Sequence, residues 1–112
     1  MSETNDLKQY FNECVPLLIA LGDETRLSVI QLLYENRCLV ENETSPGLNV
    51  NEITQKIRLS RPAVSHHLKI LKDTGLINVR RIGVCNYYYL TGEEAIRKLV
   101  KLGQILQGSP LS

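Results

Sequence analysis

The clearest periodic pattern in the chain is the apolar one that leads up to Gly75. Its apolar members recur at spacings of three and four and so share one face of a helix: Val64, Leu68 and Leu71. Ser60 is a favoured N-cap residue, and Gly75 favours a stop just beyond the last turn. The pattern therefore predicts a helix over residues 60–74 whose opposite face is polar and basic.

Weaker apolar patterns before this helix predict three more helices, over about residues 4–20, 23–35 and 52–58. Asp23 and Asn51 are the expected N-caps of the second and third of these helices. The expected core side of the second helix is Leu27, Ile30, Leu33 and Tyr34. Residues 36–49 are polar and irregular, and a short strand is predicted at Leu48 to Val50. The third helix, a tight connection and the 60–74 helix form a helix-turn-helix over residues 51–75.

After Gly75 the apolar spacing changes to two, which is typical of strands. Residues 76–90 are predicted to form a hairpin, or wing, that turns at Gly83. Thr91 to Glu94 matches a capping box for a last helix over residues 92–106. The apolar side of that helix is Ala95, Leu99, Leu102 and Leu106.

These elements predict a mainly α fold with a small β-hairpin, a single winged helix-turn-helix domain over residues 1–112 with its core at about 7–106. The expected order is helix, helix, short strand, helix, helix, strand, strand, helix. A chain of this length can bury one small core.

Charge is unevenly distributed, although the net charge is only +1. Residues 1–55 hold nine acidic and three basic residues, a balance of −6. Residues 56–81 hold seven basic residues against Asp73 alone, a balance of +6. A basic segment within a neutral chain is typical of a surface that meets nucleic-acid phosphates, with a solvated face as the alternative interpretation.

The polar face of the 60–74 helix and the first strand of the hairpin carry the groups expected to contact double-stranded DNA. Ser65 and His66 are suited to base edges, whereas lysine and arginine side chains are suited to phosphates. His67 lies nearer the apolar face, where packing and binding are both open. Because neighbours in a strand alternate, one of the two hairpin arginines should face DNA and the other the domain surface. The predicted DNA-contacting residues are Ser60, Arg61, Pro62, Ser65, His66, Lys69, Lys72, Arg80 and Arg81.

The remaining composition indicates a reducing compartment. The three cysteines are an odd number without a Cys-x-x-Cys spacing, which disfavours a disulfide framework. The polar, acidic start is unlike a secretory signal, and no apolar run approaches the ~20 residues of a membrane span. We therefore expect a cytoplasmic protein with no membrane partner.

Three segments resemble the ArsR/SmtB family of winged-helix repressors: Ala20 to Leu27, Ser65 to Leu71 with Gly75 and Leu76, and Arg80 to Gly83 with Tyr87 to Leu90. The resemblance covers about residues 7–106. It implies a homodimeric repressor that binds operator DNA with the 60–74 helix in the major groove and is released by an effector. It also implies a dimer interface built from the helices at about 4–20 and 92–106.

Two metal sites of that family lack their ligands in this sequence. Asn49 and Asn51 match the positions of a Cys-x-Cys, and asparagine is a poor ligand for soft metals. Residues 92–107 contain no His, Cys or Asp. His66 and His67 diverge by about 100° on a helix, so they cannot share a metal within one chain. We expect no metal and no other cofactor.

The effector is therefore open. Cys38, before the loop, and Cys85, near the hairpin tip and the most exposed by pattern, are candidate thiol sensors, whereas Cys14 on an apolar stripe is expected to be buried. A metal site that uses Cys38 or Cys14, an organic ligand, and no effector at all are the alternatives.

The alternative function is a winged-helix module that binds protein or RNA without operator specificity. It predicts a more apolar 60–74 helix and a weaker basic segment than the sequence has. An enzyme is the least favoured class, since the sequence has neither a Ser-His-Asp spacing nor a phosphate-binding loop.

Overall fold

The computed structural model describes residues 3–39 and 46–108 of the chain. Within these ranges, five helices accompany one two-stranded antiparallel sheet. The elements are α1 (Glu3–Leu21), α2 (Glu24–Leu39), α3 (Val50–Ile57), α4 (Arg61–Asp73), β1 (Ile77–Ile82), β2 (Cys85–Leu90) and α5 (Glu93–Gln107). The predicted mainly α fold with a hairpin wing is confirmed. None of the described helices combines the length and apolar character needed to cross a membrane.

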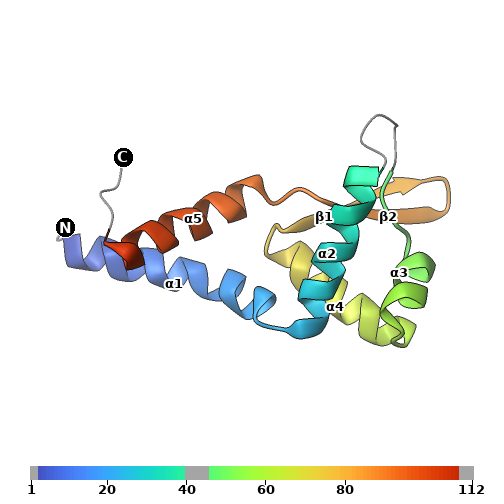
Figure 1. Ribbon diagram of the computed structural model, residues 1–112, viewed down its shortest axis with the longest axis horizontal. Coiled ribbons are helices and arrows are strands. Elements are labelled where there is room, and N and C mark those ends of the chain that lie inside the picture. The colour runs from blue at the N-terminus through green and yellow to red at the C-terminus, as the bar shows by residue number, and fades with distance from the viewer. Residues whose placement is uncertain (1–2, 40–45, 109–112) are drawn as a thin grey trace.

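The molecule consists of a head and an arm (Figure 1). The head contains α2, α3, α4, β1 and β2, and the arm is α1 with α5 packed along it. The start of α1 and the end of α5 lie at the free end of the arm, which lengthens the molecule to 50 Å against 32 and 23 Å in the other directions. Tyr10 of α1 donates its hydroxyl hydrogen to the backbone carbonyl of Lys98 in α5, and Lys101 lies 4.5 Å from the centre of its ring.

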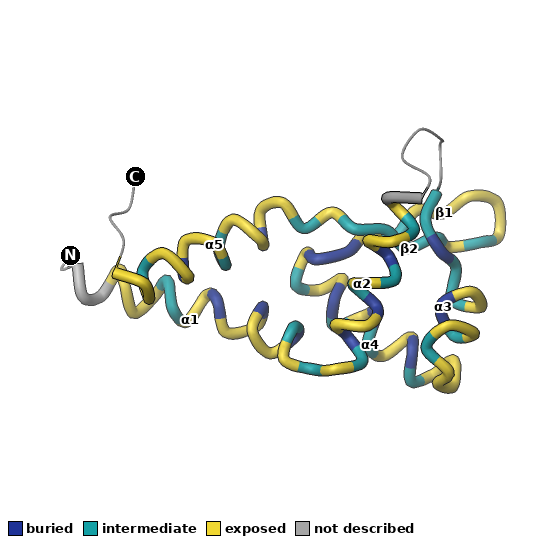
Figure 2. The backbone as a smooth tube through the Cα atoms, viewed as in Figure 1, coloured by how far each residue is buried: buried dark blue, intermediate teal, exposed yellow. Residues whose placement is uncertain are grey.

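The buried core lies mainly in the head, as the dark segments of Figure 2 show. The α4 residues predicted to face inward are at most 1% exposed. Val29 and Leu33 of α2 and Ile53 of α3 pack in the same cluster. Among the described residues, the largest fully buried side chains are Ile53, Leu68, Leu71, Ile77, Val29, Val64 and Cys14. Because α4 is held from several sides, its polar face has a fixed direction.

The prediction for α2 was wrong in two respects. The helix continues to Leu39 instead of ending near residue 35. Leu27 and Tyr34, expected in the core, are 50% and 57% exposed, whereas Val29 is fully buried. Apolar residues lie on almost every side of this helix, so spacing alone does not select the inward face. The Asp23 cap is confirmed, since its Oδ1 accepts a hydrogen bond of 3.0 Å from the Arg26 backbone N–H.

The predicted N-cap of α3 was also wrong. The cap is Asn49, whose Oδ1 accepts from the Glu52 N–H at 2.9 Å while Glu52 accepts from the Asn49 N–H at 3.0 Å. This capping box starts the helix at Val50, so the expected short strand is reduced to a single bridge between Leu48 and Tyr88. The element order therefore has one strand fewer before α3 than predicted. The bridge brings Gly47 against Tyr88, since a Cβ at Gly47 would lie 2.2 Å from the Tyr88 carbonyl oxygen.

The start of α5 differs from its prediction as well. Its N-cap is Gly92, without a side-chain cap, so the expected capping box at Thr91 is absent. The Thr91 N–H, which a capping box would pair with the side chain of Glu94, donates instead to the Leu76 carbonyl of the head at 3.3 Å. Ala95 and Leu102 are buried as expected, but Leu106 is 71% exposed in this single chain.

The hairpin agrees with its prediction. β1 and β2 pair antiparallel from Ile77 opposite Leu90 to Ile82 opposite Cys85. Gly83 lies in the turn with φ of +63°, which a glycine adopts without steric cost.

Candidate nucleic-acid interface

The recognition-type helix α4 is defined at both ends by its own sequence. Ser60 Oγ accepts a hydrogen bond of 3.3 Å from the Ala63 N–H, and Pro62 occupies the first turn. At the other end, the Gly75 N–H donates to the Lys72 carbonyl at 3.0 Å and the Leu76 N–H donates to the Leu71 carbonyl at 3.1 Å. This pair of bonds is a Schellman motif, and Gly75 adopts the left-handed conformation it needs, with φ of +79°.

The turn between α3 and α4 places the two helices as a helix-turn-helix. Arg58 ends α3 in the left-handed region, with φ of 62°, and its N–H donates to the Thr54 carbonyl at 2.8 Å. Across the turn, Arg61 Nη1 donates to Asn51 Oδ1 at 2.8 Å. The sequence did not indicate this role of Asn51, because the two residues belong to different helices.

The outward face of α4 is polar and basic, as predicted. Lys69 Nζ lies 2.9 Å from Asp73 Oδ2, and both side chains are largely exposed, at 74% and 60%. The last turn therefore holds one compensated ammonium, from Lys69, beside the ammonium of Lys72. The structure leaves every residue predicted to contact DNA exposed: Ser60, Arg61, Pro62, Ser65, His66, Lys69, Lys72, Arg80 and Arg81.

The two arginines of the wing differ in their partners. The guanidinium of Arg80 lies 4.5 Å from the centre of the Tyr89 ring, a cation–π arrangement that limits its motion. Arg81 is paired in register with Asn86. The sequence predicted that one of these arginines faces DNA and the other the domain surface. Both are exposed, so exposure alone does not identify which one faces DNA.

Behind this surface lies a buried cation that the sequence analysis did not identify. Arg26 is only 8% exposed, and its guanidinium binds two carbonyls at the end of α1 and the ring of His67 in α4. His67 is thus half-buried at a polar contact. The hydrogen bond from the backbone N–H of Arg26, and then the charge of its guanidinium, hold the pKa of Asp23 below its ordinary value. No local pattern in the sequence indicated this role, because its partners belong to α1 and α4.

The cysteines are placed differently from one another. Cys14 is fully buried, as expected for a small apolar side chain. Cys85 is half-buried at the start of β2 and so is less exposed than its place near the hairpin tip suggested. The side chain of Cys38 lies outside the described residues. Among the described side chains, no three His, Cys, Asp or Glu groups are arranged to hold a metal ion.

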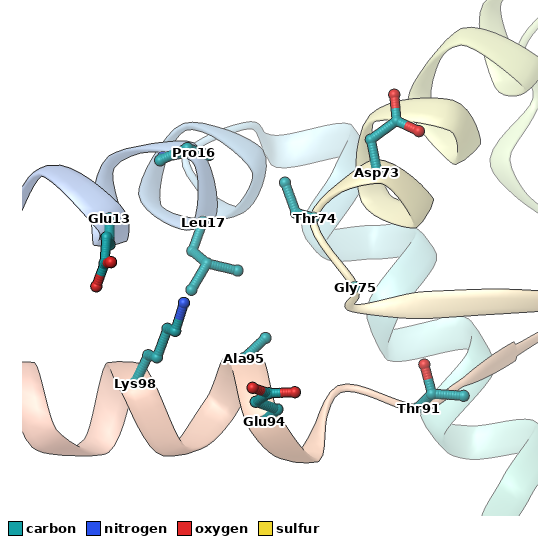
Figure 3. A pocket seen from close by; sticks show the side chains of 10 residues that line it. All are labelled: Glu13, Pro16, Leu17, Asp73, Thr74, Gly75, Thr91, Glu94, Ala95 and Lys98. Atoms are coloured by element: carbon teal, nitrogen blue, oxygen red, sulfur yellow. The ribbon is translucent and has the colours of Figure 1, made fainter.

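A cleft of about 430 Å³ lies where the arm meets the end of α4 (Figure 3). Glu13 of α1 and Lys98 of α5 lie on its two sides, and Asp73 and Glu94 add carboxylates. None of the residues predicted to contact DNA lines this cleft. The cleft and that surface are connected only through Asp73, which lines the cleft and pairs with Lys69.

Comparison with known proteins adds independent findings. Residues 23–79 match the family model described as "Bacterial regulatory protein, arsR family". An HTH-type transcriptional regulator of Methanocaldococcus jannaschii, MJ1325, is 30% identical over 82% of this chain and 92% of its own length. The transcriptional activator HlyU of Vibrio cholerae is 30% identical over 80% of this chain and 73% of its own length.

Solved structures agree with the fold. Reduced HlyU from Vibrio cholerae superposes with a TM-score of 0.61 at 27% identity, covering 90% of this chain and 95% of that one. The Mycobacterium bovis domain Mb0332, described as a homodimeric winged helix-turn-helix DNA-binding domain, gives a TM-score of 0.65 at 24% identity, covering 96% of this chain and 88% of that one.

Proposed function

Because the chain belongs to the ArsR family of DNA-binding transcriptional regulators, we propose that it is a homodimeric repressor that occupies operator DNA through α4. The observation that carries this proposal is the α4 surface: a helix anchored by buried Val64, Leu68 and Leu71 presents hydroxyl, imidazole and ammonium groups outward. A helix with this division fits the major groove.

The roles on that surface follow from side-chain chemistry. Ser65 and His66 read base edges, since both carry short polar groups on the exposed side of α4. Arg61, Lys69 and Lys72 bind phosphates and so set the register of the helix on the duplex. Arg80, stacked on Tyr89, offers a pre-oriented guanidinium to the backbone beside the groove.

The arm supplies the homodimer interface in this proposal. Its two helices expose apolar side chains that a monomer would leave in water: Leu7, Val15, Leu18, Ile19, Ile96, Val100 and Leu106. The homodimeric description of the Mycobacterium bovis domain supports the same assembly. Two heads joined through their arms would meet two half-sites of one operator.

Repression would be steric, because a dimer on an operator excludes polymerase from the same DNA. The Vibrio cholerae relative is described as an activator, so the sign of regulation is tested with an operator upstream of a reporter. A fall in reporter output with added regulator supports repression, and a rise contradicts it. The effector stays unidentified, and the cytoplasmic location expected from the sequence stays a prediction.

The decisive experiment selects genomic fragments with the purified chain, defines the operator by footprinting, and tests single base-pair changes. We expect Ser65→Ala and His66→Ala each to relax the preference at particular base pairs by about 1–3 kcal/mol. Gln31→Ala, an exposed amide on α2, is the matched control and should leave every preference unchanged. If both α4 variants keep the wild-type pattern, the reading face is not the one proposed.

A further inference from the structure

Arg26 lies in the first turn of α2, and its guanidinium contacts both the end of α1 and the α4 helix. Its Nε donates to the Ala20 carbonyl at 2.7 Å and its Nη2 to the Ile19 carbonyl at 3.1 Å, both in the last turn of α1. Its Nη1 lies 3.1 Å from Nδ1 of His67. One rigid guanidinium thus joins three helices, α1, α2 and α4.

We propose that Arg26 is a positioning residue that couples the arm to the reading face of α4 through His67. The inference rests on the proposed function, since it assigns a role in operator recognition to a group that cannot itself reach DNA. Burial of Arg26, at 8% exposure, keeps this cation away from the phosphates. Its effect on DNA binding must therefore pass through the helices that it holds.

The chemistry of the contact fixes the state of the His67 ring. A guanidinium has only donors, so Nδ1 of His67 accepts this hydrogen bond and the ring proton lies on Nε2. The ring orientation is thereby set, because only one of its two nitrogens can face Arg26. The centre of the neighbouring His66 ring lies 5.7 Å away, tilted by 59°. A displacement of His67 therefore also reaches the side chain proposed to read bases.

The contact on the α1 side has its own physical basis. The last carbonyls of a helix lack helical partners and carry partial negative charge. α1 has no basic residue in its last turn, so Arg26 from the next helix supplies the compensating cation. A change in the direction of α1 at the dimer interface would move these carbonyls and, through the guanidinium, His67. Relative motion of arm and head is thus converted into a change at the DNA surface.

The test measures the ratio of operator to non-operator affinity, by fluorescence anisotropy with labelled duplexes at a temperature where far-UV circular dichroism shows each variant folded. This ratio cancels the folded fraction and uniform electrostatic effects, so a merely structural role leaves it unchanged. Arg26→Lys keeps the positive charge but loses the planar set of guanidinium N–H donors, and His67→Leu removes the Nδ1 acceptor. His67→Asn places an oxygen near the position of Nδ1, and Arg37→Lys, an exposed arginine of α2, is the control.

We expect Arg26→Lys and His67→Leu each to lower the ratio about tenfold, the effect of losing one hydrogen bond to a charged group. The double variant should fall no further than either single variant, because both remove the same contact. The affinity ratio of His67→Asn should stay within about twofold of the wild-type ratio, and the ratio of Arg37→Lys should equal that of wild type. A wild-type ratio in Arg26→Lys, additive losses in the double variant, or equal losses in His67→Asn and His67→Leu would overturn the proposal. If Arg26→Lys does not fold, the comparison of the two His67 variants decides alone.

Hydrogen exchange on the DNA-free protein separates this inference from the proposed function. His67→Leu, a substitution in α4, should speed amide exchange in the last turn of α1, whereas His67→Asn should not. Unchanged exchange in α1 would overturn the coupling. If Ser65→Ala and His66→Ala leave operator preference intact while the Arg26 and His67 losses remain non-additive, the coupling is supported and the proposed reading face fails.

Discussion

Replacing Lys72 by glutamine tests whether the last turn of α4 meets phosphate. Lys72 is exposed on the same side of α4 as Lys69, but the Lys69 ammonium is already 2.9 Å from the Asp73 carboxylate. Each phosphate neutralised by a protein charge contributes about 0.9 to the slope of log K against log salt. The proposed homodimer would lose two such contacts, so Lys72→Gln should lower the slope by about 1.8. Over the tenfold range from about 1 M to about 0.1 M salt, this amounts to about 60-fold weaker binding at the lower concentration.

Asp73→Asn should act in the opposite direction, because it frees the Lys69 ammonium and removes a negative charge from the DNA-facing side of the helix end. Stability should change little. The exposed i,i+4 pair contributes about 0.3–0.5 kcal/mol, and removing a carboxylate from a helix C-terminus returns about 0.3–1 kcal/mol. Tighter binding without a change in unfolding midpoint is the expected signature.

The assay is fluorescence anisotropy with an operator duplex at several salt concentrations. Lys8→Gln makes the same charge change on α1, toward the free end of the arm, and serves as the matched control. At about 0.1 M salt charges are screened beyond about 10 Å, so this control should keep the wild-type slope. An unchanged slope in Lys72→Gln, or an equal fall in Lys8→Gln, would refute the assignment of this turn to the phosphate contact.

Four other outcomes are expected. Val100→Asp should shift the sedimentation of the protein from dimer to monomer while circular dichroism stays helical, and a dimer that persists would contradict the arm interface. The pKa of Asp23 is lowered in the folded state, so its contribution to stability is present above the ordinary value of 3.8 and is lost as pH falls through the lower folded-state pKa. The free energy of unfolding of Asp23→Asn should therefore fall less steeply with pH than that of wild type in this range. Gly47→Ala should destabilise the protein by more than about 1 kcal/mol in urea unfolding, because its Cβ would meet the Tyr88 carbonyl and its φ is +114°; an unchanged midpoint would contradict this. Zinc, cadmium and arsenite should not release the protein from DNA, and release that disappears when all three cysteines become serine would overturn that expectation.

Local patterns in the sequence were sufficient for the recognition-type helix and the wing. The ends of α4 depend on residues within a few positions of each other, with Ser60 capping Ala63 and Gly75 closing the last turn. Its inward face depends on one clean apolar stripe. The hairpin similarly needs only alternating residues and a glycine at the turn. Such features follow from short-range sterics and hydrogen bonding, which a sequence states directly.

Capping positions were harder to predict because several residues competed for them. Asn49 and Asn51 both suit an N-cap, and Glu52 selects Asn49 because it completes the reciprocal pair of bonds. Thr91 suits a cap equally well, but its backbone N–H bonds to Leu76 in the head, the cap is Gly92, and α5 begins one residue later than predicted. In both cases the residue type alone allowed more than one cap. A hydrogen-bond partner, Glu52 in the first case and Leu76 in the second, accompanies the cap that the structure has.

The sequence by itself determined the polar face of α4, the basic segment around it and the wing, because each is encoded within one element. Only the tertiary structure decided which side of α2 is buried and what Arg26 does. α2 carries apolar residues on several faces, and the face that enters the core is decided by the packing of α1, α3, α4 and β2 around the helix. Arg26 gains its role only when the end of α1 and His67 of α4 arrive at the two sides of its guanidinium. Contacts between residues separated by as many as 41 positions have no local signature, since they exist only after the chain has folded.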